Sequence, residues 1–537
     1  MSVGGDAGNF PACFISVALA RLAMGTKLAA RGSLAPALAP YRPARHMASP
    51  DETPTPSATP GRLYQERFPD GSEASEEFVG KFIDRHGLLQ AVMVQLTGGV
   101  FLTGFALALG ASSTVIGVLA GVPFMVKLSQ LYLSWRIERV GHWRHSALEG
   151  ALLSRAALLI AALAPLVVGR GPGAWVLVAV ISASALGATV FEMAFQTWMA
   201  ELIPERSRGE FWGRRARVAG IAGLVASLVA AFGVDRAGSD GTPTLGEFAV
   251  VISVGALAGL LGLAFLRRVP SPRRQHSRVQ PISLRDALSR PLHDVNYRRL
   301  LRFVAAWGIA GGIVAPFFAV YMLEQLRLSF LTVTILTAIT GGTMSLVQLY
   351  WGRLGDHFGA KTVLRAGTYV IAVTPFLWLF VRPGRTWLIV LIQLLAGFGW
   401  GAYHLSVTNL VLKLAPQVAR PSYLASFGAT QGLAEAFAPV LGGFTLDALV
   451  SRGLPWLTSF QVMVTISLLL FVSSTPLLGG VREPGGVTVG RMIRVMGRFR
   501  SMNTEYLGDF LFDHVYTHVA RIADFVAREE RDPREAT

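Results

Sequence analysis

The sequence has 537 residues, of which 52% are hydrophobic and only 15% are charged, and its mean hydropathy is +0.47. Soluble domains are about 25% charged, so these values exclude a disordered chain, a coiled coil and an ordinary cytosolic enzyme. They indicate an integral membrane protein. We assign the net charge of +16 to basic loops at the cytoplasmic membrane face rather than to nucleic-acid binding. The single cysteine, Cys13, excludes an internal disulfide and a cysteine-based metal site.

Residues 1–80 contain no apolar run long enough to span a bilayer and are predicted to be a flexible N-terminal segment. The first 46 are rich in Ala and Arg and carry one acid, Asp6, which is typical of a presequence. A wrongly assigned start gives the same pattern, because Met47 opens an ordinary polar N-terminus. Both interpretations stay open.

From Gly87 onward, apolar stretches of about 20 residues recur, which is the length that crosses a hydrocarbon core as a helix. Barrel strands would alternate over about 10 residues, whereas these stretches are continuously apolar. The sequence therefore predicts an all-α membrane protein. The twelve predicted spans are 87–110, 112–134, 147–168, 175–199, 216–234, 247–266, 300–323, 331–351, 362–381, 387–412, 421–447 and 456–479.

The basic residues near the span ends predict the orientation. One alternating set of loops carries 23 Lys and Arg and the opposite set carries 6, so the first set is predicted to be cytoplasmic, with both termini inside. The longest inner loop, about 267–299, is rich in Pro and Arg and divides the spans six and six. The predicted parts are an N-terminal six-helix bundle (81–268), a cytoplasmic linker (269–299), a C-terminal six-helix bundle (300–480) and a cytoplasmic tail (481–537).

The tail carries two amphipathic stretches. Residues 489–500 are basic and amphipathic, which is typical of an interfacial helix on anionic lipid. Beyond them, apolar residues recur at helical spacing from Leu507 to Val526. This pattern predicts a cytoplasmic amphipathic helix that either packs under the bundle or binds a partner.

The two halves repeat each other. Residues 134–141 correspond to 352–359 at an offset of 218, and residues 204–208 correspond to 416–420 at an offset of 212. At these residues the chain resembles the major facilitator superfamily. The loop motif of that family is approximately Gly-x-x-x-Asp-Arg-x-Gly-Arg-Arg/Lys after helix 2, with a copy after helix 8. The second copy matches at Gly352, Asp356, Gly359 and Lys361, whereas the first has Ser134, Glu138 and His142 in place of glycine, aspartate and arginine.

The resemblance implies a gate on the cytoplasmic side. In the family, the acid of each loop faces a helix of the opposite half. Asp356 is therefore expected to meet the start of helix 5, at Arg208, Arg214 or Arg217, and Glu138 to meet Arg420 at the start of helix 11. Such pairs close the inner side in one state and break in the other. The expected gate residues are Glu138, Arg139, Gly141, Gly352, Asp356, Gly359, Lys361, Arg208 and Arg420.

Ionisable residues inside the spans are functional candidates because their burial in lipid is costly. Glu192, His404 and Lys127 each lie nine residues before a charged residue at an inner helix end, about 14 Å at ~1.5 Å per residue. That depth is near the midplane of a ~30 Å core. Glu192 and His404 are also 212 residues apart, the repeat offset.

Alternatives stay open for these candidates. Glu192 is either a coupling carboxyl or part of a structural ion pair with Lys127 or Arg155. His404 is either a substrate or proton site or a hydrogen-bonded core histidine. The predicted substrate and proton pathway comprises Glu192, His404, Lys127, Glu435, Gln196, Gln95 and Trp307.

The sequence has no Walker-type phosphate loop, no H-E-x-x-H and no G-x-S-x-G motif. We therefore predict no enzyme, no cofactor and no metal site. The prediction is a monomeric, multi-pass secondary active transporter of the cell inner membrane that moves a small organic solute by alternating access and uses protons as the coupling ion. The alternatives are an exporter or uniporter of amphipathic compounds and a non-transporting facilitator-fold sensor or scaffold.

Overall fold

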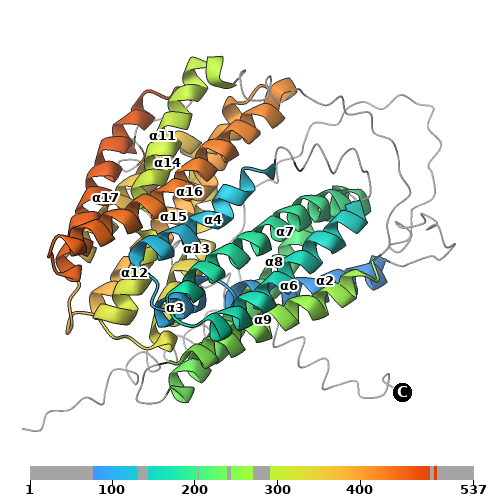
Figure 1. Cartoon of the computed structure of the whole chain (residues 1–537). Helices are drawn as coiled ribbons and strands as arrows, with labels where there is room; N and C mark the ends of the chain where they lie inside the picture. The colour runs from blue at the N-terminus through green and yellow to red at the C-terminus, as the bar shows by residue number, and fades with distance from the viewer. Residues whose placement is uncertain are drawn as a thin grey trace, which may run out of the picture. The chain divides into compact units, whose positions relative to one another are not determined.

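The computed structural model describes residues 76–130, 133, 143–203, 205–238, 243–269, 291–483, 489–490 and 492. These residues belong to one compact unit of the chain, Leu63–Thr537. Every regular element in the described part is helical (Figure 1), which agrees with the all-α prediction. Glu138, Arg139, Gly141 and most of the predicted tail helices lie outside the described residues.

The N-terminal half, residues 76–269, contains seven described helical segments. The first predicted span is broken at Gly98 and Gly99, where Gly99 has a positive φ of 53° that favours glycine. The segments are α2 (Glu76–Leu96), α3 (Gly99–Ala108), α4 (Ser113–Lys127), α6 (Trp143–Val168), α7 (Pro172–Leu202), α8 (Glu205–Ala237) and α9 (Leu245–Leu266).

The C-terminal half, residues 291–483, follows a similar order. Its first span is interrupted before Pro316, which has no N–H to continue the helical ladder. The segments are α11 (Val295–Gly312), α12 (Ala315–Val320), the π-turn η2 (Tyr321–Gln325), α13 (Phe330–Phe358), α14 (Ala360–Trp378), α15 (Trp387–Leu414), the 3-10 turn η3 (Gln417–Ala419), α16 (Arg420–Ser451) and α17 (Trp456–Gly479).

Ten helices of the described part are long and apolar enough to cross a membrane. The other two predicted spans, 112–134 and 362–381, coincide with α4, which has 15 residues, and with α14. Because α14 carries two cations and three threonines, its apolar content is lower than that of its neighbours. The count of twelve spans stays a prediction.

Helix α8 begins earlier than the sequence predicted. It starts at Glu205, whereas the predicted span started at residue 216. The arginines from 206 to 217 therefore lie on a helix and not on the preceding loop. Arginine is a good helix former, and a helix that extends past the apolar core satisfies its own backbone hydrogen bonds there.

The same helix crossing occurs in both halves. In α6 and α7, Gly150 and Gly187 face each other, and a β-carbon on Gly187 would lie 2.7 Å from the Gly150 carbonyl oxygen. In α14 and α15, Gly367 and Gly399 do the same, at 3.2 Å from the Gly367 oxygen. These glycines allow close backbone approach. Gly187 and Gly399 are 212 residues apart. Equivalent glycines of the repeat therefore make equivalent helix contacts in the two halves.

The two halves contact each other mainly through α4 with α16 and α8 with α13 (Figure 1). The first contact is backbone against backbone. A β-carbon on Gly117 would overlap the carbonyl oxygen of Pro439, one on Gly121 that of Ala436, and one on Gly443 that of Ser113. The glycines thus set how closely α4 and α16 approach.

Candidate functional site

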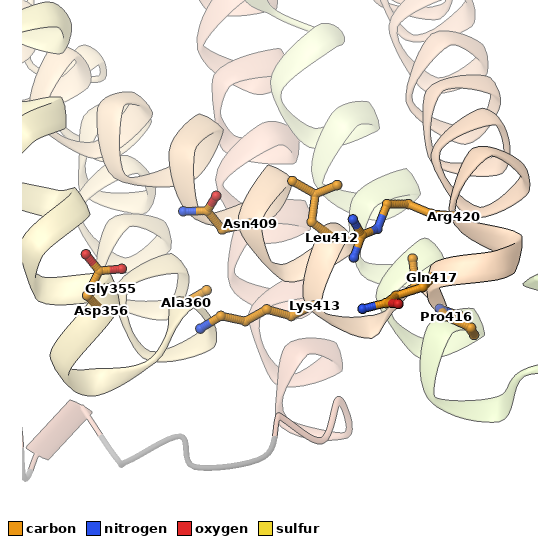
Figure 2. A pocket seen from close by; sticks show the side chains of 10 residues that line it. Gly355, Asp356, Ala360, Asn409, Leu412, Lys413, Pro416, Gln417 and Arg420 are labelled. Atoms are coloured by element: carbon orange, nitrogen blue, oxygen red, sulfur yellow. The ribbon is translucent and has the colours of Figure 1, made fainter. Parts of the chain in front are cut away.

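A polar cavity of about 620 Å³ lies at the predicted inner ends of helices in the C-terminal half. Asp356 and Arg420, both predicted gate residues, lie on opposite sides of it (Figure 2). Its charged side chains are one carboxylate and two cations, Arg420 and Lys413. The lining residues are Gly355, Asp356, Ala360, Asn409, Leu412, Lys413, Ala415, Pro416, Gln417 and Arg420.

A buried carboxylate contacts two of the residues that line this cavity, Ala360 and Lys413. Glu483, which is 1% exposed, accepts hydrogen bonds from the backbone N–H groups of Ala360 at 3.0 Å and Lys361 at 2.8 Å. Its Oε1 also lies 3.0 Å from the Lys413 ammonium. The first N–H groups of a helix have no partner within the helix, so Glu483 satisfies the start of α14. The sequence analysis did not single out Glu483, although its position just after the last span was a signal.

Three predicted gate residues, Gly352, Gly359 and Lys361, make their described contacts within the C-terminal half. Gly359 joins α13 to α14 with φ of 91°, a conformation that favours glycine. Gly352 is on α13, where a β-carbon would meet only Leu405 at 3.7 Å. The Lys361 ammonium donates to the carbonyl oxygens of Gly479, at 3.1 Å, and Val481. Lys361 therefore holds the segment after α17 against the start of α14.

The structure does not bring Asp356 to the start of α8. Arg214 forms an ion pair with Asp84 of α2 instead, at 3.1 Å. Among the described side chains, no ion pair links Asp356 to Arg214 or Arg217. The side chain of Arg208 lies outside the described residues, as does all of Glu138, so the cross-half gate pairs stay predictions.

Glu192 is exposed on α7, and Gln196, also exposed, donates to its carboxylate at 3.4 Å. Arg155 is 1% exposed and donates to the Gln90 side chain and to the carbonyl oxygens of Ala151, at 3.0 Å, and Gly259, at 3.4 Å. Arg155 therefore joins α6 to α2 and α9. Within the described part, neither Arg155 nor the exposed Lys127 lies within ion-pair distance of Glu192.

His404 is exposed on α15, and its ring stacks on Trp400 with centroids 5.4 Å apart. Trp307 lies behind this surface and is completely buried, stacked on Tyr403 at 5.7 Å and packed against Phe471 at 4.4 Å. Trp307 therefore lies in the core of the C-terminal half in this structure. Trp307 lies on an apolar helix face, so the sequence could not distinguish a core residue from one that lines a pathway.

Glu435 is half-buried on α16 and accepts a hydrogen bond from Gln431 at 2.8 Å. Lys127 is exposed on α4 of the other half, the helix that packs against α16. Gln95 is exposed on α2 and packs against Gly223 of α8.

The sequence analysis missed a cationic cluster inside the N-terminal half. His86 is completely buried between Phe191 and Phe195, with ring centroids 5.6 Å from each. The Arg215 guanidinium lies over Phe195 at 4.8 Å and 3.5 Å from Nδ1 of His86. The Arg155 guanidinium lies over Phe191 at 4.7 Å. His86 lies just before the first predicted span, and its place near Arg155 and Arg215 could not be read from spacing alone.

At the opposite, predicted outer end, two aspartates join the halves. Asp235 at the end of α8 accepts hydrogen bonds from the start of α13, and Asp447 near the end of α16 accepts them from the start of α4. In the described part of the chain, the hydrogen bonds found between the halves are at this end. The described halves are thus joined at the predicted outer end, whereas the cavity at the predicted inner end is lined by the C-terminal half.

The sequence profile of the Major Facilitator Superfamily matches residues 300–492. The C-terminal half of the chain is therefore similar to the major facilitator superfamily. The sphingosine-1-phosphate transporter SPNS2 of Danio rerio is 28% identical over 142 residues, which are 25% of this chain and 27% of that protein. The match thus spans about a quarter of the length of that curated relative.

Solved structures of known transporters share the fold. A mutant form of the nucleoside transporter NupG superposes with a TM-score of 0.60 at 14% identity, covering 74% of this chain and 99% of that chain. A bacterial homolog to the human lysosomal transporter Spinster, in an inward-facing and occupied conformation, superposes with a TM-score of 0.57 at 14% identity, covering 76% and 97%. At these identities the likeness concerns the facilitator fold alone.

Proposed function

We propose that this facilitator is a secondary active transporter of a small organic solute that works by alternating access. It acts as a monomer in the cell inner membrane, with both termini cytoplasmic. The observation that carries the proposal is the placement of Glu192 and His404. Both are exposed on membrane helices, and they occupy equivalent positions of the repeat in the two halves. Ionisable groups inside the membrane are costly in free energy and therefore rare, and those that occur mark solute or ion pathways.

Protons are the proposed coupling ion. A carboxyl whose hydration differs between two states also differs in proton affinity between them. Glu192 has one hydrogen-bond partner, Gln196, among the described side chains, so its surroundings can change as the halves move. His404 in the other half is a second titratable group, which accepts the proton or binds the solute.

The proposed cycle needs an inner gate that closes when the outer end opens. Asp356 and Arg420 line the cavity at the predicted inner end. In the closed state Asp356 would pair with an arginine at the start of α8, and Glu138 with Arg420. Such couplings are about 1–3 kcal/mol, enough to shift the population of the two states several-fold.

A second candidate function is the export of an amphipathic compound. It is favoured by the similarity of 142 residues to a sphingosine-1-phosphate transporter, because that solute combines an anionic headgroup with an apolar chain. In this case the solute would enter from the inner leaflet. Transport driven by its own gradient would then need no proton.

Reconstitution into vesicles that contain a pH-sensitive dye tests both candidates. Sphingosine-1-phosphate and nucleosides, the solutes named for the similar proteins, serve as first probes. Counterflow of a labelled probe together with probe-dependent proton flux is the expected result. Counterflow without proton flux would favour uniport or export, and a protein that moves neither across an extended solute panel would be a sensor or scaffold.

A further inference from the structure

Two aspartates of opposite halves make the same contact at the outer end. Asp447 on α16 accepts hydrogen bonds from the N–H of Ser113 at 3.1 Å, the N–H of Thr114 at 2.8 Å and the Thr114 hydroxyl at 2.7 Å. Asp235 on α8 accepts from the N–H groups of Phe330 and Leu331, both at 2.8 Å. Each carboxylate thus binds the first two N–H groups of a helix in the other half.

The two contacts are related by the internal repeat. Asp235 and Asp447 are 212 residues apart, and the receiving pairs 113–114 and 330–331 are 217 apart. The receiving helices also begin alike. Ser112 and Ser329 cap them from within, accepting from Val115 N–H at 3.4 Å and from Thr332 N–H at 3.1 Å. In both helices the serine serves the third N–H and leaves the first two to the aspartate of the other half.

These contacts are favourable for physical reasons that apply only while the halves touch. The first N–H groups of a helix lack intrahelical partners and carry the positive end of the helix dipole. A carboxylate there makes charge-assisted hydrogen bonds. Asp235 and Asp447 are both half-buried, so water competes only in part. When the halves separate, all four backbone N–H groups and both carboxylates must find water instead.

We propose that Asp235 and Asp447 are a symmetric pair of latches that hold the outer side closed and must both release before this side opens. The inference rests on the proposed alternating access. Apolar contacts lie beside the latches, such as Phe330 against Phe248 at 5.2 Å, but they are non-directional. The directional hydrogen bonds fix which helix ends meet. The latch residues therefore set the balance between the inward-facing and outward-facing states.

The test measures access from outside to the exposed surface around His404 and needs no substrate. In a Cys13→Ser background, a reporter cysteine replaces Thr408, which is exposed one turn from His404. An impermeant thiol reagent is added to intact cells. The double change Asp235→Asn and Asp447→Asn should raise the labelling rate at least about tenfold, equivalent to about 1.4 kcal/mol, and each single change should raise it less.

Asp294→Asn is the matched control. Asp294 also caps a helix start, accepting from the N–H groups of Asn296 at 2.9 Å and Tyr297 at 3.0 Å, but that helix lies in its own half. The control should leave the labelling rate unchanged. If it raises labelling as much as the double change does, the effect is general loosening and the latch is overturned.

Unchanged labelling in the double variant would also overturn the latch, whether or not any transport is found. Should the double variant not reach the membrane, Thr114→Val decides the question. It removes the hydroxyl bond to Asp447 and keeps the side-chain shape. We expect it to raise labelling about two- to threefold, and an unchanged rate would again overturn the proposal. If the variants differ in labelling as expected but transport by the unchanged protein moves no protons, only the proposed proton coupling is refuted.

Discussion

A substitution of Glu192 gives the most direct test of the proton-coupling hypothesis. Glu192→Gln keeps the size of the side chain and its hydrogen bonding to Gln196, but it removes the titratable proton. We expect solute accumulation against a gradient to fall to background, because no proton is carried, while downhill exchange continues. Accumulation and counterflow in the same vesicles measure the two activities separately.

Glu149→Gln provides a matched control for that experiment. Glu149 is two-thirds exposed near an inner helix end, where it lies 3.1 Å from His145. Its neutralisation should leave accumulation unchanged, since its carboxyl is solvated in either state. A Glu192→Gln protein that is made normally and still accumulates solute would refute the coupling role. A protein that is no longer made, and is rescued by neutralising Lys127 or Arg155, would indicate a structural ion pair.

Arg155 is expected to matter for stability. Arg155→Met removes donors that join α6 to α2 and α9 and leaves the Gln90 oxygen and two carbonyl oxygens without them. Loss of such buried bonds costs about 1–3 kcal/mol, so the midpoint of thermal unfolding in detergent should fall. Arg170→Met makes the same chemical change at an exposed position and should not lower it. Equal midpoints for the two variants would show that Arg155 is dispensable for the bundle.

Among the elements, α4 and α16 form the contact whose closeness depends on glycine. Gly443→Ala would place a β-carbon on the Ser113 carbonyl oxygen, next to the start of α4. Overpacking of this kind costs about 1–3 kcal/mol. We therefore expect a lower midpoint of thermal unfolding. The reporter cysteine in place of Thr408 should also be labelled faster from outside, because the outer ends no longer close fully.

Gly428 lies on the same helix, α16, with open space around it. Gly428→Ala should be neutral or raise stability by about 0.5–1 kcal/mol, since alanine favours the helix over glycine. If Gly443→Ala behaved like Gly428→Ala, the α4–α16 contact would not limit closure.

The elements also show what could be predicted from sequence. Lipid leaves the backbone no partner outside the helix, so long apolar runs indicated the helices, and each predicted span overlaps one. The repeat offset pointed to Glu192 and His404. Asp235 and Asp447 share that offset of 212, yet they were missed because their partners are backbone N–H groups, which have no side-chain signature. The burial of Trp307 could not be predicted, because a core face and a cavity face of an apolar helix look alike in sequence.

For the whole molecule, the aspartate contacts are at the outer end and the cavity is at the inner end only if the predicted orientation is right. The basic residues favour a cytoplasmic 267–299 loop by 23 to 6. In a Cys13→Ser background, Gln275→Cys should be labelled by an impermeant thiol reagent only after the cells are opened, and Arg385→Cys, in the loop between α14 and α15, should be labelled in intact cells. The reverse labelling pattern would show that the predicted membrane orientation is wrong. The aspartate latches would then face the cytoplasm, and the cavity at Asp356 and Arg420 would open to the outside.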